Sequence, residues 1–331
     1  MTQTRSAVLQ ALAELEGDYV SGEHLSASLG ITRASVSKAV QRLRDEGYEI
    51  ESATHRGHRL VSRPDRLTAL ELHDGLATSE LGWNHHHVET AGSTQDIARA
   101  LAADGAPHGA TVVAEEQQAG RGRLGRAYVC PRGGIWATVL LRGPVRTAQA
   151  SVTGLAAGVA VARAIAGETD LEPSLKWPND VQVGRRKVCG ILTELAAEEL
   201  AVHYLLVGIG INAAFDRKAL PVDLHDAATT LATAGGAPVS RKRILQSTLL
   251  HLEGYFEALR AGDSAPVIED WRAFPNMIGE RVRVQRWDDE LDGVAIDLDV
   301  DGALIVEAPE GQRHRVLAGD VLAPPETGAA A

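Results

Sequence analysis

The residues best suited to chemistry lie in a loop rich in glycine and arginine, with the sequence Gln117-Gln118-Ala119-Gly120-Arg121-Gly122-Arg123-Leu124-Gly125-Arg126. Its glycines match the GxGxxG pattern of dinucleotide-binding proteins, but that pattern has meaning only where the glycines open a helix that holds the pyrophosphate. Here three arginines lie between or directly after the glycines, so we reject that interpretation. Glycines also let a loop close over a ligand, and guanidinium groups neutralise phosphate oxygens. The stretch suits an adenylating enzyme, although a solvated basic loop would have the same composition.

A second candidate motif is Lys176-Trp177-Pro178-Asn179-Asp180. A lysine beside a rigid Trp-Pro pair can be held near a reacting carboxylate and an α-phosphate, where negative charge develops when pyrophosphate leaves. The Asn179 amide can donate to and accept from an adenine edge or a ribose. A hairpin turn that carries a surface lysine is the alternative interpretation.

Three further stretches combine small and polar residues. Gly92-Ser93-Thr94-Gln95 precedes a helical pattern, so Ser93 or Thr94 can cap that helix or hydrogen-bond a small ligand. Downstream, Lys187-Val188-Cys189-Gly190-Ile191-Leu192 and Gly208-Ile209-Gly210-Ile211-Asn212 place glycines inside predicted strands. Such glycines mark bulges or allow a ligand to approach the backbone.

The elements that must carry these motifs begin with a small N-terminal domain, predicted over residues 1–66. Three short helices end near Gly17, Gly30 and Gly47, and Ser21 and Thr32 can cap the second and third. The basic segment 48–61 alternates as a hairpin would, with a turn near Gly57. This order predicts a winged helix-turn-helix that binds DNA, although any small three-helix domain presents cations on its solvated face. The DNA-contacting candidates are Arg33, Ser35, Ser37, Lys38, Gln41, Arg42 and Arg56.

The rest of the chain predicts an α+β protein. Residues 67–268 alternate helices (69–78, 94–103, 151–166, 241–260) with strands (111–116, 135–141, 187–195, 202–212), which indicates a mixed sheet covered by helices. Short alternating segments separated by Gly-rich turns over 269–323 predict a small SH3-like β-barrel. Residues 324–331 are expected to form a flexible tail.

Composition narrows the classes of protein. The 331 residues include no apolar run long enough to cross a bilayer and no signal-peptide core, so we expect a cytoplasmic protein. Of the net charge of -11, residues 1–66 contribute nothing, with nine Lys/Arg against nine Asp/Glu. Cys130 and Cys189 are expected to be buried thiols. His85 and His87 share a strand face but lack further ligands nearby, so we predict solvated residues and assign no metal ligand.

Taken together, Gly-Ser-Thr-Gln, the Gly/Arg loop, Lys-Trp-Pro-Asn-Asp, Lys-Val-Cys-Gly-Ile-Leu and Val-Gly-Ile-Gly-Ile-Asn resemble, in order and spacing, the bifunctional biotin protein ligase and biotin-operon repressor family. The resemblance covers essentially the whole chain. It implies a biotin/lipoate-ligase-like catalytic domain and an enzyme that uses biotin and ATP with Mg²⁺. It also implies a biotin carboxyl carrier domain as acceptor, operator DNA as partner, and a homodimer in the adenylate-bound form.

The resemblance also implies roles for individual residues. Ser93, Thr94 and Gln95 match the biotin ureido contacts, and Gln117 and Gly190 match two further biotin contacts. Arg121, Gly122 and Arg123 match the loop over biotin and the phosphates. Lys176 matches the lysine that bridges carboxylate and phosphate, so Lys176, Arg121 and Arg123 are the catalytic candidates. The positions matched near the nucleotide are Tyr128, Asn179 and Asn212.

Two residues depart from the family pattern. Gln95 replaces the usual asparagine, which lengthens the side chain by one methylene, and Tyr128 replaces a tryptophan expected to pack on adenine. Two other functions stay open. One is a ligase for lipoate or octanoate, although the Lys-Trp-Pro-Asn-Asp motif and the Gly/Arg loop favour biotin. The other is a ligand-sensing repressor without ligase activity, against which the intact Arg121, Arg123 and Lys176 argue.

Overall fold

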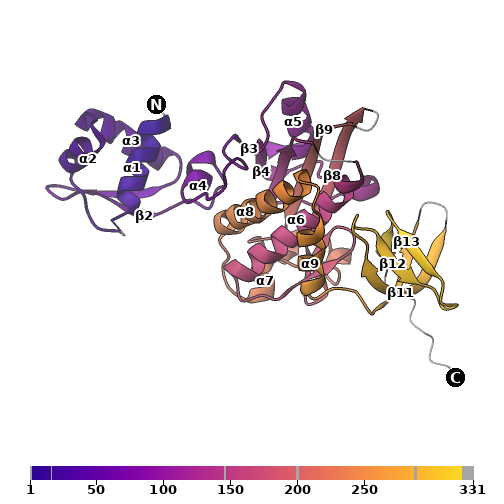
Figure 1. Cartoon of the computed structure of the whole chain (residues 1–331). Helices are drawn as coiled ribbons and strands as arrows, with labels where there is room; N and C mark the ends of the chain where they lie inside the picture. The colour runs from indigo at the N-terminus through magenta and orange to yellow at the C-terminus, as the bar shows by residue number, and fades with distance from the viewer. Residues whose placement is uncertain (1, 16, 145–146, 199–200, 287–288, 323–331) are drawn as a thin grey trace. The chain divides into compact units, whose positions relative to one another are not determined.

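The computed structural model describes residues 2–15, 17–144, 147–198, 201–286 and 289–322. The chain divides into two compact units, residues 1–66 and 67–331, which are described separately (Figure 1). No helix within the described ranges is long and apolar enough to cross a membrane. The predicted tail, residues 324–331, lies outside the described residues.

The N-terminal unit contains three helices and a hairpin, as predicted: α1 (Thr2–Ala13), α2 (Gly22–Leu29), α3 (Arg33–Asp45), β1 (Glu49–Ala53) and β2 (Gly57–Ser62). The predicted caps are confirmed, because the Ser21 and Thr32 hydroxyls accept from His24 N and Ser35 N, and Gly30 is left-handed with φ 62°. β1 and β2 are antiparallel. α1 ends earlier than predicted, and Leu15, beyond its end, is exposed.

The second unit is built on a seven-stranded mixed sheet with strand order β3-β4-β5-β9-β8-β7-β6. β3 and β4 are parallel, and the other neighbours are antiparallel. Four of the strands, β4, β5, β8 and β9, were predicted from sequence. The sheet is completed by β3 at one edge and by β7 and β6 at the other. The strands are β3 (His85–Ala91), β4 (Thr111–Gln117), β5 (Ile135–Leu141), β6 (Pro173–Lys176), β7 (Asp180–Val183), β8 (Arg186–Glu198) and β9 (Ala201–Ile211).

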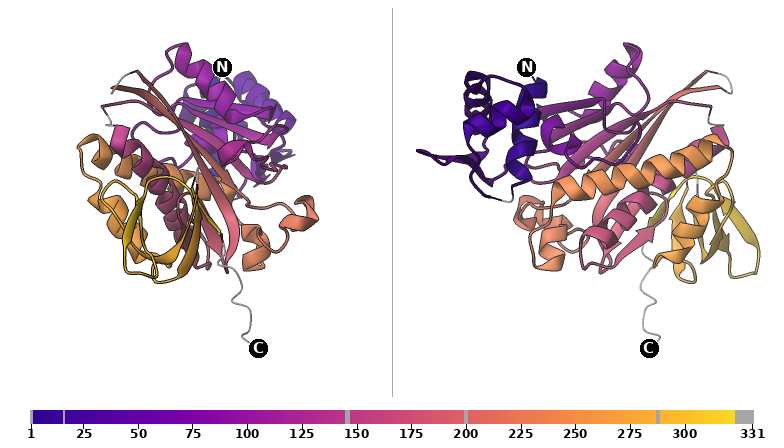
Figure 2. Two further views of the ribbon diagram at one scale, coloured as in Figure 1. Left: turned by 90° about the vertical axis from the view of Figure 1, so that its right-hand side faces the viewer. Right: turned by 60° about the vertical axis from the view of Figure 1, so that its left-hand side comes forward.

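Helices cover both faces of this sheet (Figure 2). Because side chains alternate along a strand, Val112 and Val113 of β4 point to opposite faces. Val113 belongs to the larger core, which contains α6 (Thr147–Glu168), α8 (Arg241–Arg260) and α9 (Ala265–Ala273). Val112 packs with α5 (Thr94–Ala103). The predicted helix 69–78 is shorter, because α4 (Ala69–His73) ends before Gly75, whose φ is 88°. The remaining short helix is α7 (Leu231–Gly235).

The C-terminal strands form a five-stranded antiparallel sheet with the order β13-β12-β11-β10-β14. Within the described residues this order leaves β13 and β14 at the two ends, so closure into an SH3-like barrel stays a prediction. Trp177, which follows β6, donates its indole N–H to Gly302 O at 2.9 Å. This bond links the region of the central sheet to the C-terminal sheet within the second unit. The strands are β10 (Arg281–Gln285), β11 (Glu290–Leu298), β12 (Leu304–Glu307), β13 (Arg313–Val316) and β14 (Asp320–Leu322).

Candidate functional site

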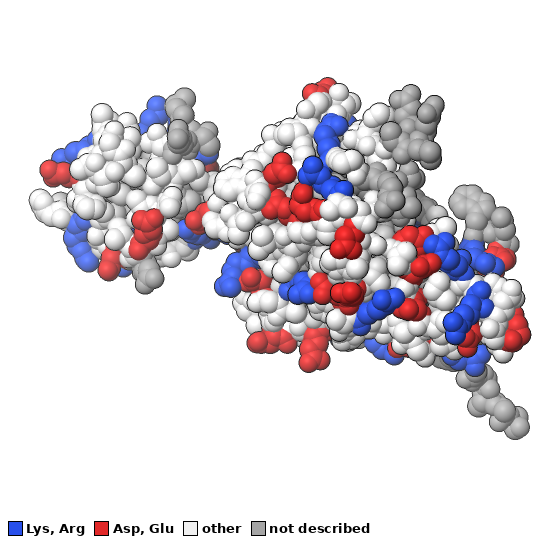
Figure 3. Space-filling model, viewed as in Figure 1, with Lys and Arg blue, Asp and Glu red and all other residues white. Residues whose placement is uncertain are grey.

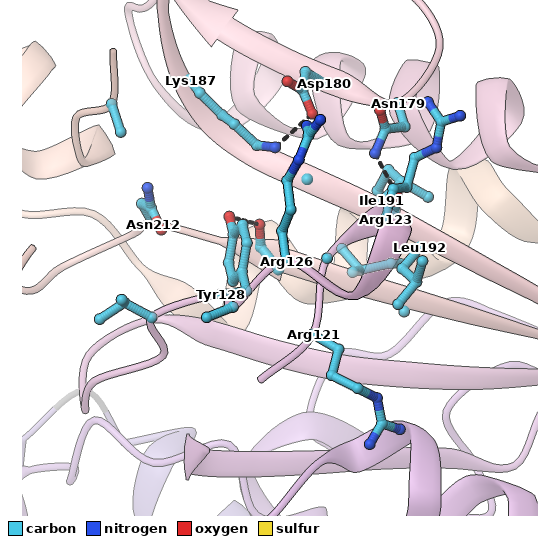
Figure 4. A pocket seen from close by; sticks show the side chains of 18 of the residues that line it. Arg121, Arg123, Arg126, Tyr128, Asn179, Asp180, Lys187, Ile191, Leu192 and Asn212 are labelled. Atoms are coloured by element: carbon cyan, nitrogen blue, oxygen red, sulfur yellow. Dashed lines mark hydrogen bonds and ion pairs between the residues drawn. The ribbon is translucent and has the colours of Figure 1, made fainter. Parts of the chain in front are cut away.

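One pocket of about 360 Å³ collects the candidates of the second unit (Figure 4). It lies on the sheet face that carries α5, beside the Gly/Arg loop and β14. Segments from five motifs that are far apart in the sequence therefore meet in one place. The lining includes every biotin and nucleotide candidate predicted from sequence, namely Ser93, Thr94, Gln95, Gln117, Arg121, Gly122, Arg123, Tyr128, Lys176, Asn179, Gly190 and Asn212.

The start of α5 forms a polar wall of the pocket. The Ser93 hydroxyl caps the helix and accepts from Gln95 N at 3.3 Å. Thr94 donates through N and Oγ1 to Gln117 Oε1, at 2.7 and 3.0 Å, which fixes the Gln117 amide. The Gln95 amide nitrogen donates to Leu192 O at 3.0 Å. Among the described residues, Gln95 Oε1 is buried without a hydrogen-bond donor.

Glycines of β8 and β9 make room for these side chains. A Cβ at position 208 would lie 3.0 Å from Gln95 Nε2, and a Cβ at position 210 would lie 3.0 Å from the Tyr128 ring. The Tyr128 hydroxyl donates to Gly210 O at 3.1 Å. A Cβ at position 190 would lie 3.0 Å from Lys187 Nζ. The glycines thus bring an aromatic ring, an amide and an ammonium group close to the sheet.

The Gly/Arg loop is a narrow turn that meets the C-terminal sheet. Gly122 N donates to Arg126 O at 2.7 Å, and the turn contains only a three-residue 3₁₀ helix, so the dinucleotide pattern has no long helix to open. Arg123 Nη1 donates to Gly319 O at 3.1 Å and lies 3.4 Å from an Asp320 carboxylate oxygen. Arg126 is also paired with Asp320. Asp320 therefore anchors two loop cations from the far end of the chain.

The Lys-Trp-Pro-Asn-Asp motif is the connection between β6 and β7. The motif forms a hairpin, because Lys176 pairs with Asp180 across the two strands. Both residues also line the pocket, so the two interpretations of the motif given by the sequence hold together. Trp177 is buried, and the Trp177–Pro178 peptide bond is cis. Asn179 donates through Nδ2 to Ile191 O at 2.8 Å.

Sequence reasoning missed a second lysine in the pocket. Lys187 Nζ lies 2.6 Å from Asp180 Oδ1 and 5.5 Å from the centroid of the Tyr128 ring. Its position next to Gly190 and Tyr128 places its charge between the predicted biotin and nucleotide contacts. The signal in the sequence is the position of this lysine three residues before Gly190, in the motif whose glycine was predicted to contact biotin. Asp180, Arg126 and Asp320 were missed as well.

The histidines of β3 differ from the prediction of solvated residues. His85 and His87 are half-buried; their Nε2 atoms lie 2.8 Å from Leu67 O and 2.9 Å from Glu115 Oε1. Glu115 Oε2 also accepts from Arg241 at 2.9 Å, so the face carries a buried polar network. The cause is the covering segment before α4, which is not apparent from the strand alone.

The thiols are buried, as predicted. Burial raises the pKa of Cys130 to about 12 and raises that of Cys189 further, which keeps both in the unreactive thiol form.

In the N-terminal unit, the predicted DNA-binding residues lie on α3 and at the hairpin turn. Arg33, Ser37, Lys38, Gln41 and Arg56 are exposed, whereas Ser35 and Arg42 are half-buried. The inward face of α3 consists of the buried residues Val36, Ala39, Val40 and Leu43. The outward face is thus polar and cationic, as a groove-contacting helix requires.

The two units together define a class of protein. A polar wall, a Gly/Arg loop and two lysines around one pocket fit a ligase that activates a carboxylate with ATP, and a separate helix-turn-helix indicates DNA binding. The biotin/lipoate A/B protein ligase family matches residues 89–212, the biotin protein ligase C-terminal domain matches 277–322, and an HTH domain matches 4–59.

Relatives agree with this class. The chain is 33% identical over 93% of its length, and 95% of the relative, to the bifunctional ligase/repressor BirA of Bacillus subtilis. It is 34% identical to the biotin--[acetyl-CoA-carboxylase] ligase of Mycobacterium tuberculosis over 77% of this chain and 95% of that one. It resembles the biotin protein ligase from Aquifex aeolicus in complex with biotin and ATP, with 28% identity and TM-score 0.62 over 72% of this chain and 97% of that one. The chain belongs to the bifunctional biotin protein ligase/repressor family.

Proposed function

We propose that the protein activates biotin with ATP to biotinyl-5′-AMP, transfers the biotin to a lysine of a biotin carboxyl carrier domain, and uses the adenylate as a signal for repression of transcription. The relatives named as bifunctional ligase/repressor support both activities, and the combination of an HTH domain with the two ligase domains supports them in one chain. We place the reaction in the cytoplasm, where ATP and carboxylases are available.

The observation that carries the biotin assignment is Gln95 Oε1, a buried acceptor without a donor among the described residues. A buried acceptor without a donor costs about 1–3 kcal/mol, so a ligand that supplies an N–H group gains this energy back. Gln95 is 4% exposed, its Oε1 is buried, and the residue lines the pocket together with Thr94 and Gln117. The ureido ring of biotin carries two N–H groups and a carbonyl, whereas lipoate and octanoate have neither a ureido ring nor any N–H group. This chemistry favours biotin over the alternative acids.

The nucleotide lies, in this proposal, between Tyr128 and Asn212. Asn212 donates through Nδ2 to Thr229 O at 3.1 Å, and its buried Oδ1 has no donor among the described residues. An adenine amino group is a donor that fits it. Tyr128 offers an aromatic face beside the β8–β9 glycines.

The reaction then has two steps. A biotin carboxylate oxygen attacks the α-phosphorus of MgATP, the bond to the β-phosphate oxygen breaks, and pyrophosphate leaves. The neutral amine of the acceptor lysine next attacks the carbonyl carbon of the mixed anhydride, the bond to AMP breaks, and the amine loses a proton. Mg²⁺ supplies charge neutralisation on the ATP phosphates. The side chains of the protein position the reactants and stabilise developing charge, without a nucleophile of their own.

Two lysines of the pocket, Lys176 and Lys187, are candidates for the cation that bridges the biotin carboxylate and the α-phosphate of ATP. Lys176 is the candidate from sequence, and we add Lys187, because its ammonium group lies beside Gly190 and Tyr128. A compact ammonium held by Asp180 is a suitable partner for two anionic groups. Arg121 and Arg123 supply further cations from the loop.

The N-terminal unit provides the regulatory half. The exposed Arg33, Lys38 and Arg56 are proposed to contact operator DNA. A single short recognition helix offers few base contacts, so we propose that the adenylate-bound chain dimerises on a two-fold symmetric site.

One experiment separates the candidate functions. The protein is incubated with MgATP, a biotin carboxyl carrier domain, and either biotin, lipoate or octanoate, and the acceptor is analysed by mass spectrometry. We expect one biotinyl group on the acceptor lysine and no transfer of the other acids. Transfer of lipoate or octanoate instead supports the alternative ligase, and no transfer of any acid supports a repressor without ligase activity. Selection of bound fragments from a random duplex library, with and without biotinyl-5′-AMP, tests DNA binding.

A further inference from the structure

Arg121, one of the proposed phosphate-binding cations, is already bound to a carboxylate at the rim of the pocket. Its Nη1 donates to Asp96 Oδ2 at 2.9 Å and its Nη2 donates to Asp96 Oδ1 at 2.6 Å. In Figure 4 the Arg121 side chain points away from the group formed by Lys187 and Asp180. The guanidinium edge that would hold two phosphate oxygens is therefore occupied by two carboxylate oxygens.

Asp96 has a second basic partner besides Arg121. Arg99 Nη1 donates to Asp96 Oδ1 at 2.7 Å, and Arg99 is also paired with Glu194. Asp96 lies in the first turn of α5, where the helix dipole stabilises a negative charge. The hydrogen bonds from Arg121 lower the pKa of Asp96 to about 2, so the carboxyl is ionised at neutral pH.

We propose that Asp96 is a positioning residue that holds Arg121 at the rim of the pocket and exchanges it for phosphate when the nucleotide binds. This inference rests on the ligase function proposed above. The exchange leaves neither charge unpaired, because Arg121 gains phosphate oxygens and Asp96 keeps Arg99. The exposed pair, with side chains 37% and 50% accessible, opposes nucleotide binding by only about two- to fivefold.

The test is made on the full chain with Asp96→Asn. We expect the KM for MgATP in pyrophosphate release to fall about two- to fivefold with kcat unchanged, because the free guanidinium no longer has to be withdrawn from a carboxylate. The Kd of a non-hydrolysable sulfamoyl analogue of biotinyl-adenylate, measured by calorimetry, falls by the same factor. Asp96→Glu keeps the carboxylate and retains values close to those of the wild type.

Two controls separate this role from a structural one. In a protein that carries Arg121→Gln there is no guanidinium group for Asp96 to hold. Adding Asp96→Asn to that variant therefore changes neither the KM for MgATP nor the Kd of the analogue. Asp297→Asn breaks a comparable exposed bidentate pair with Arg272, at 2.8 and 3.0 Å, and leaves both constants unchanged. An unchanged or higher KM in Asp96→Asn, or the same gain without Arg121, overturns the inference. A wild-type protein that transfers no biotin instead contradicts the proposed function, and this result is obtained before any variant is compared.

Discussion

The ammonium group of Lys187 lies 2.6 Å from the carboxylate of Asp180, across neighbouring strands of the central sheet. Both side chains are partly accessible, at 29% and 20%, so the pair faces the pocket. Lys176 lies at the end of β6, directly opposite Asp180 in the β6–β7 register. One carboxylate therefore stands between the two lysines that the proposed mechanism has to distinguish.

We expect Lys187→Gln to lower the rate of pyrophosphate release about 10²–10³-fold, because a group that stabilises developing negative charge contributes about 2.7–4 kcal/mol. Lys176→Gln is the matched comparison, since both lysines line the same pocket. We expect the smaller loss in that variant. An equal or larger loss in Lys176→Gln would return the bridging role to the lysine identified from sequence.

Gln95 is expected to determine affinity for biotin. Gln95→Leu removes Oε1, the acceptor that has no donor among the described residues, and we expect biotin binding to weaken about 5- to 100-fold, corresponding to about 1–3 kcal/mol. Gln95→Asn keeps an amide in a shorter side chain and should lose less. Calorimetry with biotin alone measures this, and the KM for MgATP is the internal control. Equal weakening of both ligands would show a damaged fold instead.

Much of the secondary structure could be predicted because its sequence signals are local. The apolar run 151–166 and the alternating residues of β9 identify their own structure, and the caps Ser21 and Thr32 contact backbone three residues away. The pairing of β5 with β9 could not be predicted, because many strand orders satisfy the same pattern. Four-residue strands such as β6 and β7 carry too little periodicity to identify.

The site residues likewise divide into those with a local sequence signal and those that depend on long-range contacts. The motif residues were found because their types suggest chemistry. Asp320 was not found, because nothing near it in sequence indicates that Arg123, 197 positions earlier, lies 3.4 Å away. Lys187 was not found because its orientation depends on a register shift where β7 pairs with β8, between Val181 and Gln182. The burial of His85 was not predicted, because it depends on the backbone segment at Leu67, which covers the strand.

On the face of the second unit that Figure 3 shows, acidic and basic side chains are intermingled. DNA binding should therefore depend on the N-terminal unit alone. Removal of the exposed Lys38 by Lys38→Ala should weaken binding to all duplexes and reduce the salt slope of the affinity by about one ion. Biotin transfer should be unchanged. Titration at several salt concentrations measures the slope, and an unchanged slope would show that Lys38 makes no phosphate contact.

The stability of the second unit should decrease in mild acid because of His85. Burial lowers its pKa from 6.5 to about 4, and its Nδ1 is buried without a partner among the described residues, so a proton added there has no acceptor. Between these values the unfolded chain binds a proton that the folded chain does not, so the free energy of unfolding falls as pH falls from 6.5 to 4. Above pH 6.5 both states are neutral and the effect is absent.

Glu115 extends this dependence to lower pH. Hydrogen bonds from His87 and Leu67 and the nearby Arg241 charge lower its pKa from 4.5 to about 2 despite the opposing effect of burial, so its contribution is lost between those values. In the higher range, His85→Gln keeps a donor for Leu67 O but removes the titrating ring. We expect the wild type to lose roughly 1 kcal/mol between pH 6.5 and 5.5 and His85→Gln to lose clearly less. Urea unfolding followed by tryptophan fluorescence measures the second unit, because all five tryptophans lie within residues 67–331. Equal losses in both proteins would assign the acid sensitivity to other groups.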